Sequence, residues 1–77
     1  MSERLLKVSE VAQRVGVLPS TIRYYAKLQL IRARASSRGG FQLFDDGAVV
    51  RAVEIKRLQK EERLTLEEIG ERLGAPR

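Results

Sequence analysis

The sequence of 77 residues contains no cysteine and no histidine, and each absence excludes a class of chemistry. Without cysteine there is no disulfide, no thiolate nucleophile and no thiolate metal ligand. Without histidine the chain lacks the residue that most often serves as a general base and as a ligand for transition metals. Carboxylates alone suit zinc, copper and iron poorly. We therefore expect no enzymatic activity, no metal site and no bound cofactor.

Long apolar segments are absent as well. No uninterrupted apolar run is long enough to cross a membrane, and the first residues lack the apolar core of a signal peptide. A chain of this length buries only about 60% of the surface of its unfolded state, so one small domain, residues 1–77, is expected. These features predict a cytoplasmic protein that does not associate with membranes.

Positive charge is concentrated in the first part of the chain, whose total net charge is +5. Residues 1–44 contain eight Lys or Arg and two Asp or Glu, a balance of +6, whereas residues 45–77 contain seven and eight, a balance of −1. A basic surface confined to one part of a protein is typical of polyanion binding. The alternative is a basic surface that serves only solubility, and charge alone does not decide between them.

Two short helical patterns meet at Gly16, a residue that ends helices because it adopts the left-handed conformation at little cost. Ser9 is expected to cap the first helix through its hydroxyl. The second helix begins with Pro19, which is tolerated at a first helical position. The pattern over about 9–28 predicts a helix-turn-helix, in which the second helix enters the major groove of DNA.

The second helix, expected over about 19–28, has an apolar inner face and a polar outer face. With Ile22 facing inward, a step of 100° per residue places Tyr25, Ala26 and Gln29 on the same inner side. The outer face then holds Ser20, Arg23, Tyr24 and Lys27. An ordinary solvated face is the alternative, but an exposed phenol beside two cations fits a contact with a DNA phosphate.

An arginine-rich and glycine-rich segment follows the second helix. Residues 36–40 have the composition of a turn, and residues 41–44 show a weak alternation typical of a strand. We predict a two-stranded ribbon, or wing, over about 32–44. Its cations are Arg32, Arg34 and Arg38. A disordered basic loop is the alternative, and Phe41 and Phe44 argue against it because both are expected to pack onto the core.

Two further helices complete the pattern. Asp45 is expected to cap a helix over about 45–62, and Thr65 with Glu68 forms a capping box that opens a helix over about 65–73. The short apolar stretch at residues 5–8 predicts a brief strand. The fold class predicted is therefore mainly α with a small β-hairpin, a winged helix-turn-helix.

Four motifs follow one another in a specific order. They are Thr21-Ile-Arg-Tyr-Tyr25, Leu30-Ile31, Gly40-Phe-Gln-Leu-Phe44 and Leu66-Glu-Glu-Ile69. Together, over about residues 5–73, the chain resembles the DNA-binding domain of the MerR superfamily of bacterial transcription regulators. The resemblance implies a second helix in the major groove and a wing against the flanking backbone and minor groove. The residues that it assigns to DNA contacts are Ser20, Thr21, Arg23, Tyr24, Arg38 and Gln42. We add Lys27 of the outer helix face and Arg34 of the wing as further predicted contacts.

The resemblance also implies partners. Full-length members of the superfamily dimerise through a long helix after the fourth helix, bind a palindromic promoter element and sense a ligand through a C-terminal domain. The expected partner is double-stranded DNA, bound as a homodimer through a segment absent from this chain or as a monomer. The chain also departs from the family pattern, with Leu18 where a Ser or Thr usually caps the second helix and Gln42 where the wing usually carries Arg.

Sequence-specific binding of double-stranded DNA in transcriptional regulation is our leading hypothesis. One alternative is an excisionase-like or architectural small DNA binder, which would bend DNA. Another is a winged-helix module that binds a protein through an apolar patch on its last two helices. RNA binding is disfavoured, because Phe41 and Phe44 are expected in the core rather than on a stacking platform.

Overall fold

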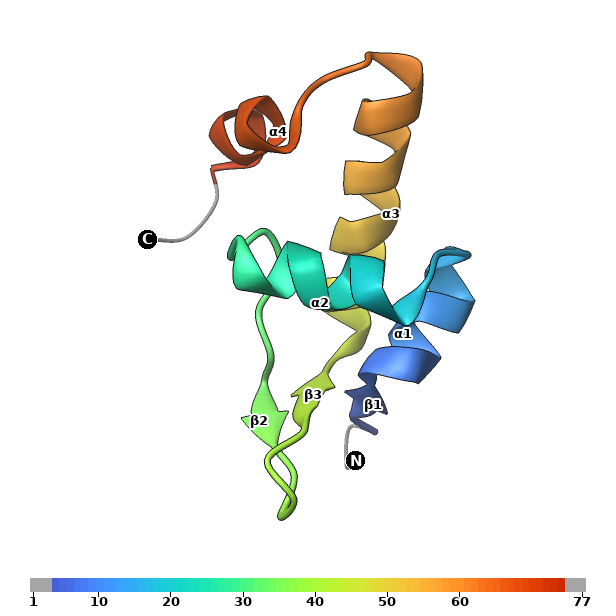
Figure 1. Ribbon diagram of the computed structural model, residues 1–77, viewed down its shortest axis with the longest axis vertical. Helices are drawn as coiled ribbons and strands as arrows, with labels where there is room; N and C mark the ends of the chain where they lie inside the picture. The colour runs from blue at the N-terminus through green and yellow to red at the C-terminus, as the bar shows by residue number, and fades with distance from the viewer. Residues whose placement is uncertain (1–3, 75–77) are drawn as a thin grey trace.

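Four helices and three short strands make up the structure, a computed structural model that describes residues 4–74. In chain order they are β1 (Leu6–Lys7), α1 (Val8–Val15), α2 (Pro19–Lys27), β2 (Ala35–Ser36), β3 (Gln42–Phe44), α3 (Asp46–Glu61) and α4 (Leu66–Leu73). Helices α1 and α2 meet at a short turn, the β2–β3 hairpin projects to one side of them, and α3 and α4 extend to the other (Figure 1). The predicted fold class, a mainly helical winged helix-turn-helix, is confirmed.

The small sheet has one strand more than the predicted wing. Its order is β1-β3-β2 with antiparallel neighbours, so the central strand β3 pairs with β2 on one side and with β1 on the other. Leu6 lies opposite Phe44, and Ala35 lies opposite Leu43. The brief strand expected near residues 5–8 is therefore present, and its pairing ties the wing to the start of α1.

Helix α1 begins at Val8, and Ser9 lies inside it, so the prediction of Ser9 as the cap is wrong. The open end is instead closed by Glu10, whose carboxylate accepts a hydrogen bond of 2.9 Å from the backbone N–H of Lys7. This hydrogen bond holds the pKa of Glu10 below its usual value. A carboxylate in the first turn also interacts favourably with the helix dipole, which a neutral serine hydroxyl does not.

Helix α2 ends in a Schellman motif built on a residue other than glycine. Gln29 has a φ of 62°, the N–H of Leu30 donates to the carbonyl of Tyr25 at 2.9 Å, and the N–H of Gln29 donates to that of Ala26 at 3.0 Å. This turn sends Leu30 and Ile31 into the core, and it leaves Gln29 exposed. The prediction that Gln29 lies on the inner face is wrong, because the helical step no longer applies after Lys27.

One apolar core joins all four helices and the sheet. Its buried members are Leu6, Val11, Ala12, Val15, Ile22, Tyr25, Leu30, Ile31, Phe44, Ala48, Ala52, Ile55, Leu58 and Ile69. The expectation that Phe44 packs onto the core is confirmed, but Phe41 is 71% exposed. Phe41 lies three residues before Phe44, and an odd spacing in an extended segment places two side chains on opposite faces, so Phe41 points away from the core.

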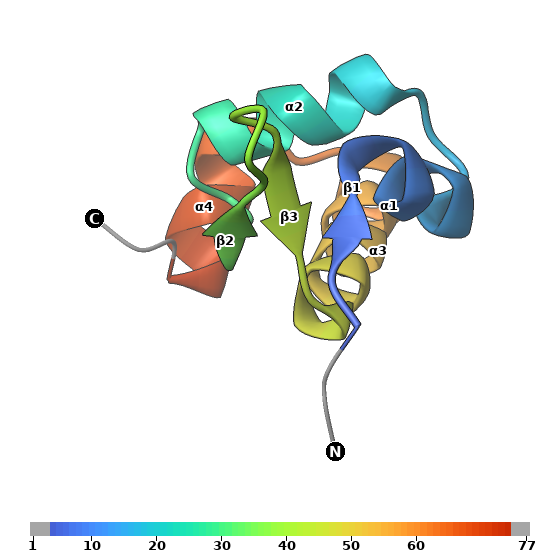
Figure 2. The ribbon, with the colours of Figure 1, turned by 90° about the horizontal axis from the view of Figure 1, so that it is seen from below.

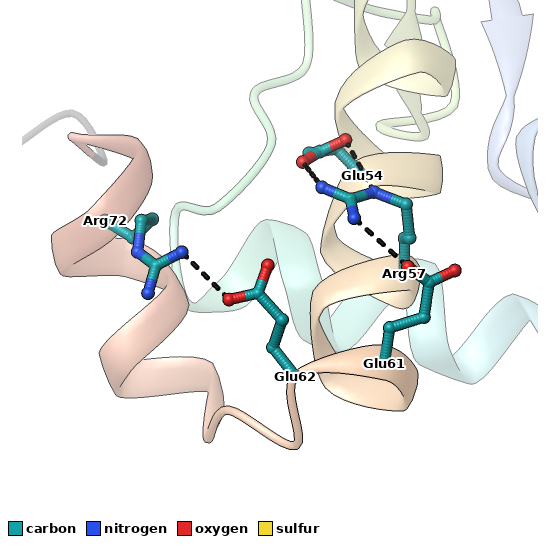
Figure 3. A network of polar contacts seen from close by, with 5 residues as sticks. All are labelled: Glu54, Arg57, Glu61, Glu62 and Arg72. Carbon is teal, nitrogen blue, oxygen red and sulfur yellow. Dashed lines mark hydrogen bonds and ion pairs between the residues drawn. The ribbon is translucent and has the colours of Figure 1, made fainter.

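The caps predicted for the last two helices are confirmed. The Asp45 carboxylate accepts a hydrogen bond of 3.1 Å from the N–H of Ala48, and Thr65 and Glu68 form the capping box of α4. Figure 3 shows ion pairs near the end of α3: Arg72 of α4 binds Glu62 at 3.1 Å. On the exposed side of α3, Arg57 binds both Glu54 and Glu61.

Candidate nucleic-acid interface

Helix α2 is held to the rest of the molecule by its inner face. Ile22 is fully buried and Tyr25 is only 2% exposed. The Tyr25 hydroxyl donates a hydrogen bond of 2.7 Å to Oε1 of Gln59 on α3, which satisfies the one polar group on this face. Burial raises the pKa of the Tyr25 phenol. The position of Tyr25 on the inner side agrees with the prediction.

The outer face of α2 is open to solvent. Ser20, Arg23, Tyr24 and Lys27 are all exposed, and Thr21 is half-buried. Tyr24 is 51% exposed, which leaves an aromatic ring and a hydroxyl on the surface between two cations. The face carries hydrogen-bond donors and positive charge and no carboxylate, because none of the residues of α2 is acidic. Such a surface suits an anion.

The tip of the wing is a tight turn whose shape depends on glycine. The Gly40 N–H donates to the carbonyl of Ser37 at 2.9 Å, and the Ser37 N–H donates to that of Phe41 at 2.7 Å. Gly40 has a φ of 83°, a conformation that other residues adopt at a cost. The Phe41 ring lies so close to Gly39 that a Cβ there would come within 3.1 Å of it. The turn leaves Arg38 exposed.

An open cleft of about 710 Å³ lies between the wing, the start of α1 and α2. Figure 2 shows α2 and the wing tip on the same side of the molecule, away from α3 and α4. The cleft is lined by Lys7, Val8, Ser9, Pro19, Arg23, Ser37, Arg38, Gly39, Gly40, Phe41, Gln42 and Leu43. Of the residues predicted to contact DNA, the cleft brings together Arg23, Arg38 and Gln42. The others (Ser20, Thr21, Tyr24, Lys27 and Arg34) lie outside its walls.

Lys7 and Phe41 also line the cleft, although neither is a predicted DNA contact. Lys7 enters because the pairing of β1 with β3 brings it beside the wing, and its charge was the only signal in the sequence. The sequence predicts Phe41 in the core, whereas the structure exposes it on the cleft wall. Its odd spacing from Phe44 is the signal in the sequence, because two residues three positions apart in a strand lie on opposite faces.

Most of the cations predicted to contact DNA differ in their partners from several cations elsewhere in the molecule. Arg4, Arg14, Arg34, Arg57 and Arg72 each bind a carboxylate. Within residues 4–74, by contrast, Arg23, Lys27 and Arg38 form no ion pair with a side chain. A cation without an internal partner can bind an external phosphate without first breaking an ion pair. These three cations lie on α2 and the wing tip. Among residues 4–74, Lys7, Arg32, Lys60 and Arg63 also form no such ion pair, but they were not predicted to contact DNA.

Arg34 differs from the other arginines predicted for the wing. Its guanidinium lies 3.3 Å from the Asp45 carboxylate, which also caps α3. Arg34 therefore ties the start of β2 to the start of α3. Its side chain is still 55% exposed.

The chemistry that the described residues offer is anion binding. Nowhere in residues 4–74 do three or more acidic side chains gather in a way that could hold a metal ion. The same residues contain no helix that is both long enough and apolar enough to span a bilayer.

Comparison with known proteins gives one family. A family model described as MerR HTH family regulatory protein matches residues 6–75. The mercuric resistance operon regulatory protein of Bacillus cereus is 38% identical over 68 residues, which is 88% of this chain and 51% of that protein. This chain thus spans about half the length of its curated relative.

Solved structures with the same fold include three regulators. A MerR-family transcriptional regulator from Bacillus cereus (24% identity) and PbrR691 from Ralstonia metallidurans in complex with lead(II) (29% identity) each superpose with a TM-score of 0.78. They are matched over 91% and 90% of this chain and over 52% and 53% of their own. HiNmlR, a MerR-family regulator lacking the sensor domain and bound to promoter DNA, has a TM-score of 0.70 at 19% identity, over 88% of this chain and 53% of its own.

Proposed function

Because the chain belongs to the MerR family of helix-turn-helix regulatory proteins, we propose that it binds double-stranded DNA in the control of transcription. Residues 1–77 would act as one DNA-binding domain in the cytoplasm, with no enzymatic step. Helix α2 would enter the major groove, and the wing would lie on the flanking backbone or minor groove. A single module of this size buries roughly 600–1,000 Å² on DNA.

The observation that carries the proposal is the cleft with an unpaired cation on each wall. Arg23 of α2 and Arg38 of the wing tip both line it, and Lys7 adds a third charge. A strand of phosphates passing between α2 and the wing would meet cations on both sides. A fold of the same kind, in HiNmlR, is bound to promoter DNA.

We assign the following contacts. Arg23, Tyr24 and Lys27 on α2 would bind phosphates or the groove, and Ser20 and Thr21 would lie at the end of α2 that enters the groove. The contacts of the wing would come from Arg34, Arg38 and Gln42. Arg34 would bind DNA through the exposed part of its guanidinium while it remains paired with Asp45.

The test is a fluorescence-polarisation titration with a random-sequence 30-mer duplex and with the promoter region next to the gene, at several salt concentrations. We expect tighter binding to the promoter and a steep fall of affinity with salt. Arg23→Ala should weaken promoter binding by about 1–3 kcal/mol. Arg38→Ala should weaken binding to both duplexes alike. It should also reduce the slope of log affinity against log salt concentration by about one unit.

The matched control is Arg57→Ala, which removes the same charge from the exposed side of α3, where Arg57 is already paired with two carboxylates. It should leave both affinities nearly unchanged. If Arg23→Ala binds as tightly as the wild type, the assignment of the α2 face is wrong. If the wild-type chain binds neither duplex at low salt, the proposal fails in favour of a protein-interaction module. Val50, 70% exposed on α3, would then be the first place to look for the partner.

A further inference from the structure

Arg51 of α3 binds the ends of two different helical segments with one side chain. Its Nε donates to the carbonyl of Leu30 at 3.2 Å, and its Nη2 donates to the carbonyl of Leu73 at 3.3 Å. Leu30 is the residue at which the Schellman turn of α2 closes, and Leu73 is the last residue of α4. The half-buried guanidinium therefore joins the end of α2 to the end of α4.

The two ends that Arg51 joins face each other across an open space. A cleft of about 420 Å³ is lined by residues of both ends, Leu30 and Ile31 on one side and Gly74 on the other, with Arg51 in its wall. A movement of the end of α4 must therefore either break the hydrogen bond between Arg51 and Leu73 or displace Leu30, because the same guanidinium binds both carbonyls.

Two more polar side chains of α3 hold the helix-turn-helix elsewhere. Lys56 places its Nζ 3.4 Å from the carbonyls of Val15 and Gly16, which precede α2. Gln59 accepts the hydrogen bond from Tyr25 in the last turn of α2. Together with Arg51, these side chains attach α3 to the chain at three places: before α2, within α2 and after α2. Of these three contacts, Arg51 alone also reaches α4.

We propose that Arg51 is a positioning residue for DNA binding, which fixes the orientation of α2 relative to α4 without touching DNA. The inference rests on the proposed function. The angle at which α2 presents Arg23 and Tyr24 then depends on the two carbonyl bonds of Arg51. Coupling of this kind is reciprocal, so DNA bound to α2 also restrains the end of α4.

The chemistry requires arginine rather than any cation. The guanidinium is a rigid fork whose donors point in different directions, so it can bind two carbonyls of different segments at once. Lysine has the same charge, but its single ammonium on a flexible stem cannot hold both carbonyls in the same geometry. Arg51→Lys therefore separates the geometry of the side chain from its charge.

The experiment compares wild type, Arg51→Met, Arg51→Lys and the control Arg57→Met in polarisation titrations against the promoter duplex at several salt concentrations. Each variant is first checked for a folded circular-dichroism spectrum and a melting temperature well above that of the assay. We expect Arg51→Met to bind about tenfold more weakly than Arg57→Met, which loses the same charge from the same helix. The salt slope of Arg51→Met should equal that of Arg57→Met. Arg51→Lys should bind DNA about as weakly as Arg51→Met and not as tightly as the wild type.

Any other result would contradict the inference, and the measurements show which alternative applies. A salt slope that falls by about one unit in Arg51→Met relative to Arg57→Met would make Arg51 a phosphate contact. Recovery of affinity in Arg51→Lys would show that only charge matters. Unchanged affinity with a lower melting temperature would show a role in stability alone. If Arg51→Met does not fold, the comparison of Arg51→Lys with the wild type tests the inference, since lysine keeps the charge and one donor group. Wild-type affinity of Arg51→Lys would then refute it. Absence of DNA binding by wild type would instead refute the proposed function.

Discussion

The hydrogen bond between Tyr25 and Gln59 gives the sharpest test of how α2 is held on α3. Tyr25→Phe removes only the hydroxyl and keeps the ring, which is 2% exposed and packed in the core. The bond that is lost is short, at 2.7 Å between the hydroxyl and Oε1 of Gln59. Gln59 itself is exposed, so its amide regains water in the variant. The change therefore isolates one hydrogen bond without a cavity.

The size of the effect follows from this geometry. A hydrogen bond of this kind contributes about 0.5–1.5 kcal/mol net, and no buried acceptor is left without a partner to add a larger penalty. For a domain of 60–100 residues, a loss of 1 kcal/mol lowers the melting temperature by roughly 4–8 °C. We expect Tyr25→Phe to lose about 0.5–1.5 kcal/mol of unfolding free energy at neutral pH, with a corresponding decrease in melting temperature.

The same residue predicts a pH dependence with a definite sign. Burial raises the pKa of Tyr25 above the value of the unfolded phenol, which is 10.0. The stability that this provides is fully present below pH 10 and is lost as the pH rises through the pKa of the folded state. In that window the unfolded chain has released a proton that the folded chain keeps, so the free energy of unfolding falls by up to about 1.4 kcal/mol per pH unit. Phenylalanine has no such proton.

The assay is urea unfolding followed by circular dichroism, for wild type and Tyr25→Phe, from pH 7 to pH 11. The difference in unfolding free energy should be about 1 kcal/mol at pH 7 and should shrink above pH 10. Tyr24→Phe is the control, since Tyr24 is half exposed and its change should stay within about 0.5 kcal/mol. Equal stability of Tyr25→Phe and wild type at pH 7, or a difference that grows with pH, would refute the reasoning.

The helix caps provide two further tests by thermal unfolding. Thr65→Ala removes the hydroxyl that accepts the N–H of Glu68 at 3.1 Å and should cost about 1 kcal/mol, whereas Thr65→Ser should cost much less. Leu18 begins α2 without any side-chain cap and is 69% exposed, so Leu18→Ser should stabilise the protein by roughly 0.5–2 kcal/mol relative to Leu18→Ala. A serine variant no more stable than the alanine variant would mean that α2 does not need the cap.

The elements of this fold could be predicted from sequence because each has a local chemical signal. Pro19, Asp45 and Thr65 start α2, α3 and α4, and Gly16 ends α1. Each acts on residues within one helical turn, so the signal is contained in a few consecutive letters. Two local signals compete at the start of α1. Ser9 looked like a cap, but the charged Glu10 one residue later closes the helix end instead.

The errors in the wing have the opposite origin, since they depend on residues far apart in sequence. Phe41 and Phe44 are both aromatic and three residues apart, yet Phe44 is buried and Phe41 is exposed. The odd spacing puts them on opposite faces, and the pairing of β3 with β1, which places Phe44 opposite Leu6, decides which face meets the core. That pairing joins segments almost forty residues apart, and nothing in the letters around Phe41 specifies it.

The candidate interface shows the same limit for charge. Arg34 and Arg38 are four residues apart in one basic segment, and their surroundings in the sequence do not distinguish them. In the fold, Asp45 lies 3.3 Å from Arg34, so this guanidinium is neutralised in part by the carboxylate that caps α3. Arg38 lies at the wing tip beyond the reach of any carboxylate of residues 4–74 and lines the cleft opposite Arg23. The sequence therefore locates the positive charge, but the placement of the carboxylates selects the cations that are free to bind phosphate.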